Sequence, residues 1–156
     1  MHNITAMEEN TQSQQANKLI FWGLFLFLCG LLAGLFVQNM ANPRMALSAH
    51  LEGVMNGMFL VLLGLIWKRL ILSKTLLKAT FWLVVYGTFA NLIAVIIAAL
   101  TGFGKMIPIA GGQEGSKAVE MLISFLLMSL ALCMLAVCII VLIGFYRHMQ
   151  QREANV

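Results

Sequence analysis

Four long runs of hydrophobic residues divide the chain, and short polar segments separate them. The runs cover residues 19–40, 47–67, 76–100 and 119–146. Each run is long enough to cross about 30 Å of hydrocarbon as a helix. Because the connections are short, consecutive helices should lie side by side and antiparallel. The pattern therefore predicts an all-α membrane protein, with four transmembrane helices in an up-down-up-down bundle over residues 18–148.

The two ends of the chain are polar. Residues 1–17, MHNITAMEENTQSQQAN, are rich in Gln and Asn and are expected to form a disordered or surface tail. This segment lacks the basic start and the cleavage site of a signal peptide, so the first hydrophobic run should stay in the mature protein. Residues 149–156 form a second short tail.

Composition agrees with a membrane protein and excludes several other classes. Hydrophobic residues make up 61% of the chain and charged residues only 10%, against about 25% charged in soluble domains. No basic patch interleaved with aromatic residues suggests nucleic-acid binding. The three cysteines lie inside hydrophobic runs without a CxxC pair, so neither a disulfide framework nor a zinc site is indicated.

The basic residues are distributed unevenly between the two sides of the predicted bundle. Arg44, Lys105 and Lys117 lie on one side. The other side has Lys18, Lys68, Arg69, Lys74, Lys78, Arg147 and Arg152. The positive-inside rule therefore predicts that both termini are cytoplasmic.

The second run contains an unusual polar group, His50, Glu52 and Asn56. At about 100° per residue, Gly53 and Gly57 fall on the same side of the helix as His50. A glycine face would let a flat ring system lie close to the helix while the imidazole coordinates its metal, as in haem proteins. Helix packing is the alternative for this face, and geometry alone favours it.

Other polar residues also have two interpretations. Glu52 and Asn56 are one turn apart and could bond to each other, and Asn91 could form a hydrogen bond between helices. Tyr86 is either a packing residue or a member of a site. Glu120 is expected to begin the fourth helix, where the helix dipole favours an acid. The glycine-rich segment 102–117 matches no phosphate-binding loop and is either a lid or an ordinary connection.

Three longer strings resemble the hydroxylaminobenzene mutases. They are NPRMALSAHLEGVMNGMFLVLLGLIW, VYGTFANLIA and MIPIAGGQEGS, and the resemblance covers residues 42–129. That family consists of small membrane enzymes with four predicted spans. The resemblance implies a reaction that moves the hydroxyl of an aryl hydroxylamine from nitrogen to the ortho carbon, giving a 2-aminophenol. It also implies a small aromatic substrate and a bacterial inner membrane.

A more distant resemblance is to bacterial styrene oxide isomerase. There too a histidine is followed six residues later by Asn-Gly, as His50 is by Asn56, and an aromatic-Ala-Asn triplet ends at the position of Asn91. The likeness implies a homotrimer with haem b between subunits, His50 as the axial ligand of the iron and Asn56 beside the substrate oxygen. The isomerases have a tyrosine one turn after the triplet, where this chain has Val95. Tyr86 is a possible substitute.

These observations combine into one hypothesis. Haem b at His50, against Gly53 and Gly57, would polarise the N–O bond, while Asn56 and Asn91 hold the oxygen or the nitrogen. Tyr86 or Glu52 would move the proton. The alternatives are a small transporter or assembly subunit, an electron-transfer haem protein, an epoxide isomerase-like haem enzyme, and a mutase without haem in which Glu52 is the acid.

Overall fold

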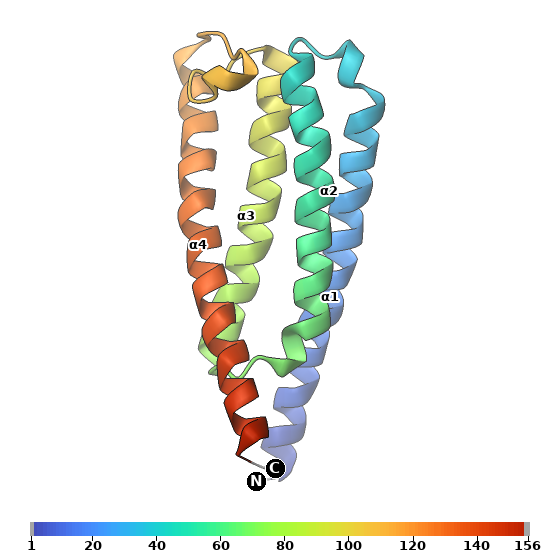
Figure 1. Cartoon of the computed structure of the whole chain (residues 1–156), viewed down its shortest axis with the longest axis vertical. Helices are drawn as coiled ribbons and strands as arrows, with labels where there is room; N and C mark the ends of the chain where they lie inside the picture. Colours follow the sequence, from blue (N-terminus) through green and yellow to red (C-terminus); the bar gives the residue numbers. More distant parts are fainter. Residues whose placement is uncertain (1, 155–156) are drawn as a thin grey trace.

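The protein is built from four long helices, as the hydrophobic pattern predicts (Figure 1). The computed structural model describes residues 2–154, with side chains from residue 10 onward. The helices are α1 (His2–Leu35), α2 (Pro43–Ile66), α3 (Lys74–Thr101) and α4 (Lys117–Glu153). Short 3₁₀ helices lie between them: η1 (Val37–Asn39), η2 (Trp67–Arg69) and η3 (Pro108–Ala110). All four long helices are apolar enough to cross a membrane.

The helices alternate in direction, so both termini lie at one end with the α2–α3 turn (Figure 1). The α1–α2 and α3–α4 connections lie at the opposite end. Helix α1 packs mainly on α2, α2 on α3, and α3 on α4. Helix α4 is the most exposed of the four, since Ile123, Val137 and Gly144 are its buried residues.

Glycines bring α1 and α2 into backbone contact. A Cβ atom placed on Gly53 would lie 2.5 Å from the Cα atom of Gly30, and one on Gly57 would lie 2.7 Å from the carbonyl oxygen of Gly23. A Cβ atom placed on Gly64 would lie 2.9 Å from the carbonyl oxygen of Ala16. In lipid such close approach supplies the packing that holds helices together. The α1–α2 pair is therefore the tightest part of the fold.

The polar N-terminal segment belongs to α1, so of the two expectations for it, a disordered tail is wrong for residues 10–17, which are helical and mostly at the surface. The side chain of Gln12 donates to the carbonyl oxygen of Trp67 at 2.8 Å. The indole N–H of Trp67, which is fully buried, donates to Gln15 at 3.1 Å. These bonds satisfy polar groups at the end of α2. The C-terminal tail is also helical up to Glu153.

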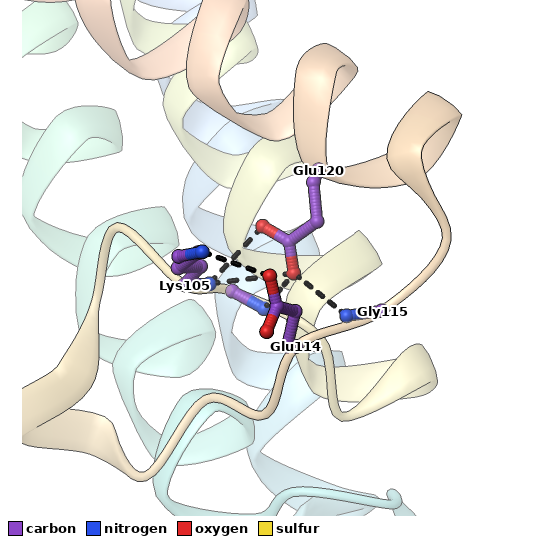
Figure 2. Close-up of polar contacts among 5 residues, drawn as sticks. Lys105, Glu114, Gly115 and Glu120 are labelled. Atoms are coloured by element: carbon purple, nitrogen blue, oxygen red, sulfur yellow. Dashed lines mark hydrogen bonds and ion pairs between the residues drawn. The ribbon is translucent and has the colours of Figure 1, made fainter.

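The α3–α4 connection is an ordered cap, and Glu120 organises it (Figure 2). Its carboxylate accepts from the backbone N–H groups of Gly104 at 3.1 Å, Lys105 at 3.1 Å and Gly115 at 3.2 Å. Glu120 lies in the first turn of α4, as predicted, but it also binds the connection. Nearby, the exposed side chain of Lys105 lies 2.8 Å from Glu114. This hydrogen bond lowers the pKa of Glu114 and raises that of Lys105.

The glycine contact predicts a stability loss on adding one methyl group. Gly53→Ala should lower the free energy of unfolding by about 1–3 kcal/mol, the usual cost of overpacking. Met128→Ala, on the exposed surface of α4, is the control and should have little effect. Thermal unfolding in detergent measures both, and equal stability of Gly53→Ala and wild type would contradict the close contact.

The Glu120 contacts predict a local effect on the cap. Glu120→Ala should speed hydrogen exchange at Gly104, Lys105 and Gly115 by about tenfold, because charge-assisted hydrogen bonds are lost. Glu114→Gln breaks the exposed Lys105 pair, which contributes little, and should leave these amides protected. Exchange measured by mass spectrometry distinguishes the two variants. Unchanged protection in Glu120→Ala would show that the cap is held by something else.

Candidate functional site

The three polar residues of α2 lie on two sides of the helix. His50 turns toward α1, whereas Glu52 and Asn56 turn toward α3. The exposed side chains of Leu51 and Met55 lie between these two sides. The sequence places the three residues within seven positions, but the fold separates the histidine from the other two.

His50 is held by the glycines of α1. Its Nδ1 atom lies 2.9 Å from the carbonyl oxygen of Gly30. A Cβ atom on Gly34 would lie 2.6 Å from the same nitrogen, so only glycine there leaves room for the ring. Because a carbonyl oxygen can only accept, Nδ1 carries the hydrogen, and in a neutral ring with this tautomer Nε2 has the lone pair. A backbone carbonyl on one ring nitrogen is the usual way to orient a histidine that binds metal through the other.

An apolar groove of about 550 Å³ adjoins this ring. It lies between α1 and α2 at the end that carries their connection, and it opens at the surface of the chain. Its lining residues are Leu31, Leu32, Gly34, Leu35, Val37, Leu47 and His50. A single oriented imidazole beside apolar walls fits the requirements of an axial haem ligand. Within the part of the chain that the structure describes, no three His, Cys, Asp or Glu residues cluster as a metal site.

The glycine face of α2 does not fit the role predicted for it. Gly53 and Gly57 are buried, and α1 covers them with its own backbone. A flat ring cannot enter a contact that has no space for a methyl group. The prediction that Gly53 and Gly57 hold a cofactor is therefore wrong, and the alternative of helix packing holds for this face.

Glu52, Asn56 and Asn91 form a half-buried polar cluster between α2 and α3. The amide of Asn91 donates to Oε2 of Glu52 at 2.6 Å, and that of Asn56 donates to the same oxygen at 3.3 Å. Both interactions were anticipated as alternatives to a catalytic role. Two amides on one oxygen fix the carboxyl group in place, and no hydrogen bond to Oε1 is present among the described residues.

Tyr86 lies apart from this cluster. Its hydroxyl is 2.6 Å from Oγ of Ser129 on α4. Ser129 uses its own hydrogen on the carbonyl oxygen of Leu126 at 3.1 Å, so Tyr86 is the donor. Of the predicted site residues, the fold therefore unites Glu52, Asn56 and Asn91. The partners Gly30, Gly34 and Ser129 were missed as such, since no local pattern shows which residue faces a neighbouring helix.

The two hydrogen bonds to Glu52 predict a ranking of variants. Asn91→Leu should destabilise the protein by about 1 kcal/mol, because a short bond between helices is lost. Asn56→Leu removes a longer bond within one helix and should cost less. Thermal unfolding in detergent measures both. The reverse order would show that Asn91 does not link the two helices.

Comparisons with known proteins identify a family and two relatives of this chain. The model of the styrene oxide isomerase family matches residues 15–146. Hydroxylaminobenzene mutase HabB of Ectopseudomonas oleovorans is 49% identical over 154 residues, covering 97% of this chain and 94% of that protein. Hydroxylaminobenzene mutase HabA of the same organism is 48% identical over 127 residues, covering 80% of this chain and 94% of that protein. No solved structure matches the chain significantly.

The family match covers most of the chain, and both relatives align over nearly their full lengths. The match starts at Gln15, within the helical N-terminal extension, and ends at Tyr146 near the end of α4. This protein is therefore a member of the styrene oxide isomerase family, an integral membrane enzyme of the isomerase and mutase class.

Proposed function

We propose that this enzyme converts hydroxylaminobenzene, or a related aryl hydroxylamine, to 2-aminophenol by intramolecular hydroxyl transfer. The similarity to two hydroxylaminobenzene mutases supports this substrate class. The reaction conserves all atoms. The N–O bond breaks, a C–O bond forms at the ortho carbon, and the proton lost from that carbon is balanced by one gained at nitrogen.

Haem b is the cofactor in this proposal, and His50 is the residue that would hold it. The observation that supports it is the imidazole that is fixed by Gly30 and lines an apolar groove. When bound, the haem iron supplies a Lewis acid for the N–O bond. The chain itself contributes the orientation of the ligand, because the bond to Gly30 sets both the ring angle and the tautomer.

The apolar lining of the groove contributes the second part of the chemistry. Leucine and valine side chains exclude water from the groove. In such surroundings the released oxygen is returned to the ring and is not exchanged with solvent. An aromatic substrate of low polarity can reach this groove through the bilayer.

Glu52 is the residue that we assign to the proton shift. Its carboxyl group is fixed by Asn56 and Asn91, and Oε1 remains available for a proton. Asn56 and Asn91 therefore act first as positioning residues for Glu52, and their amide oxygens can accept from the substrate N–H. Tyr86 is less suited to this task, since its hydroxyl binds Ser129 on α4.

A complete site requires a second copy of the chain. His50 and the Glu52 cluster lie at opposite edges of the exposed face of α2, with Leu51 and Met55 between them. Neighbouring copies in a closed ring would bring the histidine of one to the cluster of the next. We propose a homo-oligomer on this ground, and the resemblance to the isomerases suggests a trimer.

We also propose an orientation in the membrane from the distribution of basic residues. Most of the basic side chains lie at the end with the termini and the α2–α3 turn. Both termini are therefore assigned to the cytoplasm, in a bacterial inner membrane.

The test is an assay of membranes with hydroxylaminobenzene, followed by chromatography for 2-aminophenol. Wild type should form this product, and the detergent-purified protein should show a Soret band. His50→Ala should lose both the band and the activity. His148→Ala, near the end of α4, is the matched control and should keep both.

Each negative outcome has a separate meaning. Absence of 2-aminophenol with the wild type contradicts the substrate class. Activity without haem, or full activity of His50→Ala, contradicts the cofactor and leaves Glu52 as the acid. In that case Glu52→Gln should abolish product formation.

A further inference from the structure

A second groove lies between α2 and α4, at the end of the molecule that carries the termini. Its volume is about 440 Å³, within the range of small-molecule sites. Five of its lining residues are hydrophobic side chains of α2, including Phe59, Leu62, Leu65 and Ile66, and Val141 of α4 faces them. Arg69 is its one charged lining residue.

The α2–α3 turn fixes this end of the groove. The backbone N–H of Ile71 donates to the carbonyl oxygen of Gly144 on α4 at 3.1 Å. The side chain of Leu72 packs where a Cβ atom of Gly144 would be, at 2.9 Å. Figure 1 shows this turn passing beside α4 below the space between α2 and α4. The groove is therefore preformed, with its charged residue on a fixed turn.

Arg69 has no carboxylate partner among the described residues. Among the acids whose side chains the structure describes, Glu52, Glu114 and Glu120 belong to the opposite half of the molecule, and Glu153 lies about two helical turns beyond Tyr146. Further basic residues belong to the same end: Lys68, Lys74, Lys78 and Arg147. A guanidinium at the end of an apolar groove, without a carboxylate partner among the described side chains, is complementary to a molecule with an anionic head and a hydrocarbon chain.

We propose that this groove binds one anionic phospholipid from the leaflet on the side of the termini. Its phosphate binds the guanidinium of Arg69, which suits bidentate recognition of phosphate. One acyl chain lies along α2 against Leu62, Leu65 and Ile66 and contacts Val141. The bilayer supplies this ligand directly, and the mechanism proposed above does not use the groove.

Such a lipid would stabilise α4. This helix packs on α3 and touches the α2–α3 turn, and its buried residues are few. A chain lying between α2 and α4 adds contacts that the protein itself does not make. We therefore expect the lipid to raise the unfolding temperature and to bind independently of catalytic activity.

The test uses the full-length protein in detergent, with native mass spectrometry and thermal unfolding. Phosphatidylglycerol should bind and raise Tm, whereas phosphatidylcholine should do so weakly. Arg69→Gln should weaken binding of phosphatidylglycerol by about tenfold, because a charge-assisted bidentate contact is lost. Leu65→Trp should fill the groove and remove the lipid-dependent shift while the charge is kept. Lys78→Gln, with the same charge change on the exposed surface of α3, is the control.

Three results would overturn the inference. The first is equal phosphatidylglycerol binding by Arg69→Gln and wild type. The second is an equal loss in Lys78→Gln, which would indicate general surface charge and no defined site. The third is a change of oligomeric mass in Leu65→Trp without loss of lipid, which would show that a second copy of the chain covers the groove.

Discussion

The backbone contact between Gly30 and Gly53 is the interaction on which the rest of the structure depends. It brings α1 close enough to α2 for the carbonyl oxygen of Gly30 to accept from His50. Gly34, one turn further along α1, leaves the space that the imidazole occupies. Helix packing and the orientation of the histidine are therefore one feature. A side chain at Gly30 or Gly53 would separate the two helices and release the imidazole of His50.

The buried polar groups at membrane depth are held by hydrogen-bond partners among the described residues. Each buried side-chain nitrogen and oxygen among the described residues has a hydrogen bond. Glu52 is held by two amides, and the hydroxyls of Thr80, Thr88 and Thr101 bond to their own helix. Because an unsatisfied polar group in lipid costs several kcal/mol, complete hydrogen bonding of the buried groups is expected. It also means that the geometry of Glu52 is set before any ligand binds.

The two ends of the bundle are closed by different devices. At one end the carboxylate of Glu120 accepts hydrogen bonds from backbone N–H groups of the α3–α4 connection. At the other, Gln12 and Gln15 reach from α1 to the end of α2. Between these ends α4 is held along one side only, which leaves the groove at Arg69 available to lipid. The exposed face of α2 is available to another copy.

The sequence by itself determined the number of spans, their order and the class of fold, because hydrophobicity and run length are properties of a segment alone. The hydrogen bond between Glu52 and Asn56 could also be predicted from the sequence, since residues one turn apart are neighbours on any helix. Only the tertiary structure decided that Gly53 and Gly57 face α1, that Tyr86 faces Ser129, and that the polar N-terminal segment is a packed part of α1. Each of these depends on which neighbouring helix covers a given face, and the helical period shows a face without showing its partner.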